Sequence, residues 1–101
     1  MNEVVTTPRT EDVVKPARPK LHKVILLNDD YTPRAFVVRV LKSEFGMPEG
    51  AAARVMLTAH QRGACVVAVF TKEVAEEKAT RATDMARKEG HPLTFTTEPE
   101  E

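Results

Sequence analysis

Cysteine is scarce in this sequence, and long apolar runs are missing from it. Cys65 is the only cysteine among 101 residues, so no intrachain disulfide can form, and no group of cysteine and histidine residues has the spacing of a zinc site. A reducing compartment such as the cytoplasm fits this composition best. The longest apolar run, from Ala64 to Phe70, is too short to cross a bilayer, and the N-terminus lacks the apolar segment of a secretion signal. We therefore expect a cytoplasmic protein with no membrane partner.

An excess of charge of one sign is also absent. Fifteen basic and fifteen acidic residues give a formal net charge of zero, there is no tryptophan, and Tyr31 is the only tyrosine. A nucleic-acid-binding protein needs a basic surface and often aromatic side chains that stack on bases, so we expect no nucleic-acid partner. No glycine-rich phosphate loop, HExxH motif or GxSxG motif occurs, so the sequence indicates neither a class of enzyme nor a cofactor.

The chain contains enough residues for one domain, preceded by a polar segment. Apolar residues make up 42% of the 101 residues, which suffices for a core without disulfides or a structural metal. Residues 1–20 contain Pro8, Pro16 and Pro19, mixed charges and no aromatic residue, so they bury too little apolar surface to offset the entropy cost of ordering. We expect a flexible N-terminal arm at 1–20 and a single folded domain at 21–101.

Apolar periodicity in the folded part predicts strands and helices in a defined order. The expected elements are a strand at 23–27, a helix from Thr32 and Pro33 to Gly46, a helix at 48–62, a buried central strand at 64–70, a helix at 72–88 and a strand at 93–97. Threonine can cap a helix and proline suits its first position, which places the first helix start at Thr32. The β-α-α-β-α-β order predicts an α+β fold. We expect a two-layer single domain in which a three-stranded antiparallel sheet packs with three helices on one face, while the other face is partly exposed.

The densest polar cluster, Asn28-Asp29-Asp30, separates the first strand from the first helix. Two carboxylates and an amide can bind a cation, but Asn-Asp-Asp before Thr-Pro more often forms a turn followed by a helix cap. His60 lies one helical turn after Met56, on nearly the same face, so it is a candidate ligand contact. A lone histidine on a helix is nevertheless more often a surface residue.

These residues are also compatible with two other classes of function. One is a small metal-dependent hydrolase, in which Asp29, Asp30 and His60 would form a metal-assisted or acid/base site. Neighbouring carboxylates and one histidine specify a metal poorly, so this pattern alone does not favour an enzyme. The other is a ribosome-type or stalk-type interaction domain with the same α+β architecture.

Four segments together resemble the ClpS family of protease adaptors. They are KVILLNDDYTP at 23–33, VMLTAH at 55–60, VFTKEVAEEK at 69–78 and HPL at 91–93. The segments occur in the expected order and the resemblance covers about Leu21 to Thr97, so the combination is specific although each piece alone is weak. The resemblance implies an adaptor without enzymatic activity or cofactor. Such an adaptor binds N-degrons, which are N-terminal Leu, Phe, Tyr or Trp residues. It delivers the proteins that carry them to a Clp AAA+ unfoldase and its ClpP peptidase.

The resemblance also implies roles for individual residues, by matching position. The α-amino group of the substrate would be bound by Asn28, Asp30 and His60, with added negative charge from Asp29. The hydrophobic side chain of the substrate would enter a pocket lined by Leu26, Thr32, Arg34, Val37, Met56, Ala59 and Leu93. The positions that dock on the N-terminal domain of a ClpA-type unfoldase correspond to Glu73 and Lys78. The arm matches the segment needed for delivery, and no metal is implied.

The chemistry of the matched residues agrees with these roles. An α-ammonium has three hydrogen-bond donors, so a site that binds it needs several acceptors. These can be an amide oxygen, a carboxylate and an unprotonated imidazole nitrogen. Two positions depart from the family pattern. Arg34 stands where the family has Met and places a cation at the pocket rim. Ala59 stands where the family has Val, and its smaller side chain leaves more space at the pocket wall. Both bear on the preference among Leu, Phe, Tyr and Trp.

Overall fold

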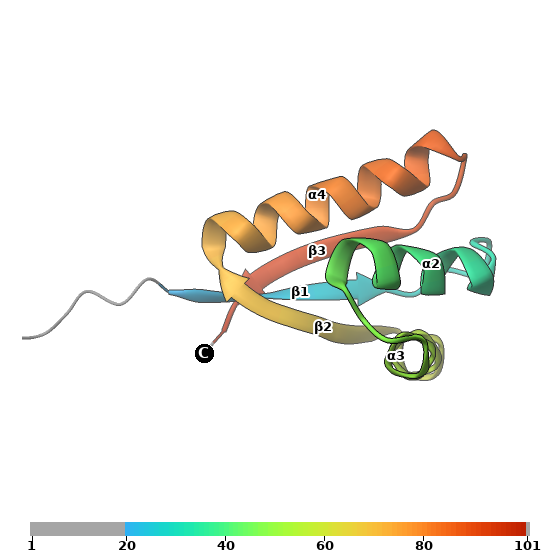
Figure 1. Cartoon of the computed structure of the whole chain (residues 1–101), viewed down its shortest axis with the longest axis horizontal. Helices are drawn as coiled ribbons and strands as arrows, with labels where there is room; N and C mark the ends of the chain where they lie inside the picture. The colour runs from blue at the N-terminus through green and yellow to red at the C-terminus, as the bar shows by residue number, and fades with distance from the viewer. Residues whose placement is uncertain (1–19, 101) are drawn as a thin grey trace, which may run out of the picture.

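The computed structural model describes residues 20–100 and has the predicted α+β fold (Figure 1). Its elements, in chain order, are β1 (Leu21–Leu27), α2 (Arg34–Phe45), α3 (Glu49–Arg62), β2 (Ala64–Thr71), α4 (Lys72–Lys88) and β3 (Thr94–Pro99). The β-α-α-β-α-β order and the antiparallel sheet are therefore confirmed. Apart from Lys20, the arm predicted at 1–20 lies outside the described residues.

The strand order in the sheet is β2-β1-β3, with both pairs antiparallel, so β1 is the central strand. The prediction that 64–70 forms a buried central strand is wrong, because β2 is an edge strand whose Val66 and Val69 are 46% and 37% exposed. In the register these two residues pair with Ile25 and Lys23, on the sheet face opposite the core residues of β1. A β-branched apolar run is compatible with either position.

The core lies between the sheet and the helices. Alternate residues of β1 are buried on the helix side, among them Val24 at 0% and Leu26 at 1% exposure. The face of α4 toward the sheet consists of small residues, namely Ala75, Ala79, Ala82 and Ala86. Small side chains let α4 lie flat across the sheet, while α2 and α3 gather at the end where β1 finishes (Figure 1). Within residues 20–100, no helix is both long and apolar enough to cross a membrane.

The first helix begins one residue later than predicted. Pro33, and not Thr32, is the N-cap of α2, and its carbonyl accepts hydrogen bonds from the Phe36 and Val37 N–H groups at 3.0 and 3.2 Å. The Thr32 hydroxyl instead donates to the Asp29 carboxylate at 2.9 Å. The threonine therefore organises the loop before the helix and does not cap the helix itself.

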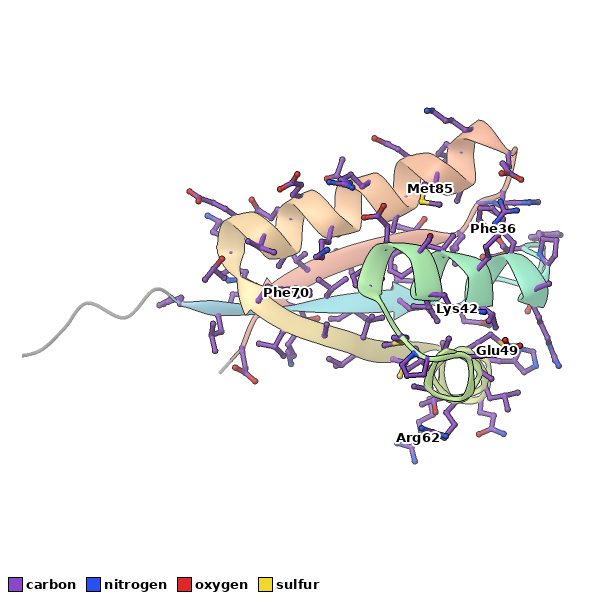
Figure 2. All side chains as sticks on the ribbon, in the orientation of Figure 1. Phe36, Lys42, Glu49, Arg62, Phe70 and Met85 are labelled. Carbon is purple, nitrogen blue, oxygen red and sulfur yellow. The ribbon has the colours of Figure 1, made fainter. Side chains whose placement is uncertain are left out.

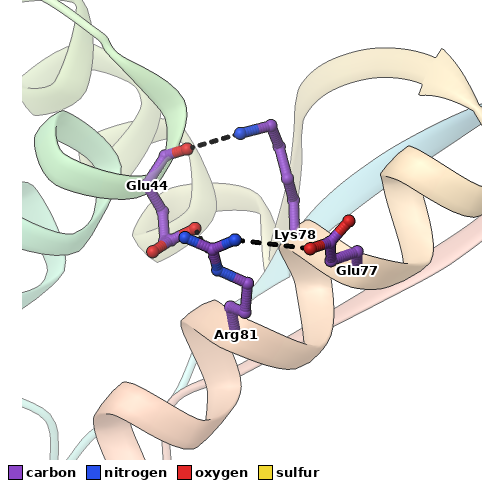
Figure 3. A network of polar contacts seen from close by, with 4 residues as sticks. All are labelled: Glu44, Glu77, Lys78 and Arg81. Atoms are coloured by element: carbon purple, nitrogen blue, oxygen red, sulfur yellow. Dashed lines mark hydrogen bonds and ion pairs between the residues drawn. The ribbon is translucent and has the colours of Figure 1, made fainter.

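Polar contacts fix α2 against α4 (Figure 3). The Lys78 ammonium donates to the Glu44 carbonyl in the last turn of α2 at 3.1 Å, where a cation also meets the negative end of the helix dipole. Arg81 contacts the Glu44 carboxylate at 3.3 Å and the Glu77 carboxylate at 3.4 Å. These contacts hold α2 in place, and α2 forms one wall of the cavity described next.

Candidate functional site

A cavity of about 170 Å³ lies where the end of β1, the start of α2 and the end of α3 meet. The residues that line it are Leu26, Leu27, Asn28, Asp29, Asp30, Thr32, Arg34, Val37, Met56, Ala59, His60 and Leu93. All residues that the sequence assigned to the amine site and to the side-chain pocket are in this set. Leu27 is the one addition, and alternation along the strand would have placed it on the face opposite Leu26.

The cavity has an apolar floor and a polar mouth. Leu26 and Leu93 in the floor are each 1% exposed and Ala59 in the wall is 2% exposed, whereas Asp30 and His60 are exposed. A cavity of about 150 Å³ holds a benzene ring, and drug-sized ligands use about 300 to 1,000 Å³. This cavity, at about 170 Å³, therefore suits one apolar side chain and not a larger molecule.

One glycine brings the polar residues at the mouth together. Gly63 ends α3 with φ +91°, and its N–H donates to the Ala59 carbonyl at 2.8 Å. The Gly63 carbonyl in turn accepts from the Asn28 N–H at 3.0 Å. A residue with a Cβ adopts this backbone conformation at a cost, so glycine suits the position. The bond ties the loop after β1 to the end of α3, which places Asn28 near His60.

The Asp29 carboxylate stabilises the loop between β1 and α2 through hydrogen bonds. Its carboxylate accepts from the Tyr31 N–H at 2.8 Å, and from the Thr32 N–H and hydroxyl at 2.7 and 2.9 Å. Burial raises the pKa of Asp29, but these hydrogen bonds and the nearby His91 outweigh it and hold the pKa below its ordinary value. Asp29 thus stays ionised and adds negative charge to the mouth, while its oxygens serve the turn that the sequence pattern suggested.

Asn28, Asp30 and His60 are the acceptors left at the mouth. Among residues 20–100, the side chains of Asn28 and Asp30 make no hydrogen bond, so both can serve a ligand. The His60 Nε2 lies 3.4 Å from an Arg34 guanidinium nitrogen at the rim. The mouth therefore combines two unengaged oxygen acceptors with an imidazole that contacts a cation.

Arg87 is a positioning residue that the sequence analysis missed. Its guanidinium donates to the carbonyls of His91 and Leu93 at 2.9 and 2.7 Å, and to the Thr94 hydroxyl at 2.9 Å. These bonds shape the loop between α4 and β3, and so they hold Leu93 in the cavity floor. The available signal was a basic residue in the last turn of α4, just before a loop whose carbonyls need donors.

The described part of the chain contains no group of metal ligands of the kind that the hydrolase alternative requires. Between residues 20 and 100, no three His, Cys, Asp or Glu side chains converge closely enough to hold a metal ion. Both oxygens of Asp29 are also engaged by the loop. Asp29, Asp30 and His60 line one cavity, but their arrangement is not that of a metal centre.

The two residues matched to unfoldase docking lie away from the cavity, on α4. Glu73 is exposed in the first turn of the helix. Lys78 is half-buried, bonded to the Glu44 carbonyl, and 5.7 Å from the centre of the Phe70 ring. Lys78 therefore has a structural role in addition to any contact with a partner (Figure 3).

Comparisons with known proteins agree with the sequence and the fold. The family model of the ATP-dependent Clp protease adaptor protein ClpS matches residues 17–96. The chain is 66% identical to the ATP-dependent Clp protease adapter protein ClpS 1 of Bradyrhizobium diazoefficiens over the full length of both chains. It is 64% identical to ClpS 2 of Mesorhizobium japonicum, again over both full lengths. The solved structure of Agrobacterium tumefaciens ClpS2 bound to L-phenylalaninamide covers 82% of this chain and 100% of its own, with a TM-score of 0.81 and 59% identity.

Proposed function

The chain belongs to the ClpS family of ATP-dependent Clp protease adaptor proteins, and on this basis we propose that its cavity binds N-degrons for delivery to a Clp protease. The observation that supports this most is a cavity sized for one side chain, with an apolar floor and unengaged acceptors at its mouth. The ligand of the Agrobacterium relative, L-phenylalaninamide, combines a free α-amino group with one aromatic side chain. The cavity offers matching surfaces for both parts.

The ammonium end of the degron supplies much of the affinity. Burying a Leu or Phe side chain contributes roughly 1.5 to 3 kcal/mol, while a micromolar complex needs about 8 kcal/mol net of the costs of association. The apolar floor alone is therefore insufficient. Charge-assisted hydrogen bonds from the ammonium to Asn28, Asp30 and His60, each about 1.5 to 3 kcal/mol, make up the difference.

The proposal describes an adaptor and not an enzyme. The cavity binds the N-terminus, and bond cleavage belongs to the protease. Exposed Glu73, together with Lys78, forms the proposed docking position for the N-terminal domain of a ClpA-type unfoldase in the cytoplasm. Residues 1–20, upstream of the folded domain at 21–101, take part in the hand-over of the substrate.

A peptide that differs only at its α-amino group tests this function. We expect a Leu-starting or Phe-starting peptide to bind with micromolar affinity or better, and its N-acetylated form to bind at least about a hundredfold more weakly. Acetylation removes the charge and leaves Asp30 without a cationic partner. Fluorescence anisotropy measures both affinities, and mass spectrometry shows whether the peptide stays intact. Equal binding of the two forms, or cleavage of the peptide, would refute the proposal.

Replacing Ala59 by valine should change which side chains enter the cavity. Ala59 is 2% exposed and lines the wall, so two added methyl groups reduce the space available to the ligand. We expect Trp-starting peptides to lose at least about five times more affinity than Leu-starting peptides, as measured by anisotropy. Ala53→Val is the matched control, because Ala53 lies on the same helix but does not line the cavity. Equal losses for Trp and Leu would show that residue 59 does not form the wall.

A further inference from the structure

A second hollow adjoins the mouth of the cavity and shares one residue with it. This hollow, here called the α2 groove, has a volume of about 590 Å³ and runs along α2 to the start of α3. Its lining includes Arg34, Val38, Arg39, Lys42 and Glu49. Arg34 lines both the cavity and the α2 groove, so it lies at the boundary between them.

The other two cations of the α2 groove are already paired with carboxylates. Arg39 contacts Glu89 at 2.7 Å and lies 4.9 Å from the centre of the Phe36 ring. Lys42 contacts Glu49 at 3.1 Å, and Figure 2 shows the two side chains facing each other between α2 and α3. Within residues 20–100, no carboxylate lies within 4.0 Å of the Arg34 guanidinium. Of these three cations of the groove, Arg34 is therefore the one without a carboxylate partner among the described residues, and it lies at the junction with the cavity.

Arg34 also occupies the place where the substrate amine should bind. Its guanidinium lies 3.4 Å from the His60 Nε2. A guanidinium can only donate, so this contact uses the acceptor side of the imidazole, which an ammonium would need as well. Two cations at one acceptor repel each other. An arriving α-ammonium therefore displaces the Arg34 side chain from His60 and leaves it without a partner at the rim.

We infer that the displaced Arg34 binds an acidic side chain at the second or third position of the substrate, so that this chain prefers N-degrons followed by Glu or Asp. The inference rests on the proposed N-degron function. Residues 2 and 3 span at most about 7 Å beyond the first, so they lie at the mouth, within reach of a long side chain on the first turn of α2. A carboxylate there provides the bidentate partner that guanidinium geometry favours.

Three peptides and one variant test this inference. Leu-Glu-Glu, Leu-Gln-Gln and Leu-Lys-Lys peptides, otherwise identical, are titrated by anisotropy against the full chain at about 50 mM and about 500 mM salt. At low salt we expect the Glu peptide to bind about fivefold tighter than the Gln peptide, as for an ion pair at an exposed edge, and the Lys peptide to bind more weakly still. High salt should reduce the difference. Arg34→Gln should make the affinities for the Glu and Gln peptides equal, because the guanidinium that pairs with the carboxylates is gone.

A matched control separates the position of the charge from its amount. Arg54→Gln removes an exposed cation of α3 that lines neither hollow, and it should keep the preference for Glu. Equal affinity for the Glu and Gln peptides, or a preference that survives in Arg34→Gln, overturns the inference and leaves the N-degron function standing. Failure of the Gln peptide to bind, or binding unaffected by N-acetylation, refutes the N-degron function itself.

Discussion

Replacing either Asp30 or His60 by alanine is expected to raise the dissociation constant of a Leu-starting peptide by at least about a hundredfold. In the proposed ammonium site, each substitution removes one acceptor and leaves a partly desolvated cation short of a hydrogen bond. That cost is the sum of a lost charged bond, about 1.5 to 3 kcal/mol, and the penalty of the unpaired donor, about 1 to 3 kcal/mol. Fluorescence anisotropy with a labelled Leu-starting peptide measures the change.

The same two variants should fold normally, which makes the result interpretable. Both side chains are exposed, and among the described residues the Asp30 carboxylate takes part in no hydrogen bond or ion pair. Thermal unfolding should therefore show a melting temperature close to that of the unmodified chain. Asp84→Ala is the matched control, since it removes an exposed carboxylate of α4 that does not line the cavity. Full affinity in either the Asp30 or the His60 variant would remove that residue from the amine site.

Local signals in the sequence were sufficient to predict most of the fold. Strand β1 and helix α4 were predicted because their apolar periods and flanking breakers agree with one another. The position of β2 in the sheet could not be predicted in the same way. Which strand is central depends on pairings between residues far apart in the chain, such as Ile25 with Val66 and Ile25 with Thr96.

The cavity was predicted from a resemblance, and its polar geometry required the structure. The contact between Arg34 and His60 joins residues 26 positions apart, and no spacing rule indicates it. The same holds for Lys78, whose ammonium bonds to the Glu44 carbonyl 34 positions away. Asp29 is the opposite case. Local Asx chemistry predicts the turn at 28–30, and the structure confirms that turn, whereas the helix cap expected to follow it at Thr32 is wrong.

Deleting residues 2–15 should separate the capture of a substrate from its delivery. The residues that line the cavity all lie from Leu26 onward, so degron affinity should remain within about twofold of that of the full chain. Binding to the unfoldase should largely survive, because Glu73 and Lys78 belong to the folded domain. Degradation of a Leu-starting fluorescent reporter by the complete protease should nevertheless fall at least about tenfold. The reason is that the proposal assigns the hand-over step to residues 1–20, and this deletion removes most of them.

Two further variants identify which part of delivery has failed. A Gly/Ser segment of equal length in place of residues 2–15 should restore degradation if the unfoldase engages any extended chain, and should fail to do so if it reads the sequence of the arm. Glu73→Lys should weaken the adaptor–unfoldase complex and leave peptide affinity unchanged, because charge reversal at an exposed position acts on the encounter with the partner. Lys78→Glu is a poorer probe, since it also removes the bond that fixes α2 to α4 and thereby disturbs a wall of the cavity. A truncated adaptor that supports degradation at the full rate, while Glu73→Lys does not, would assign delivery to docking alone and leave residues 2–15 with no part in it.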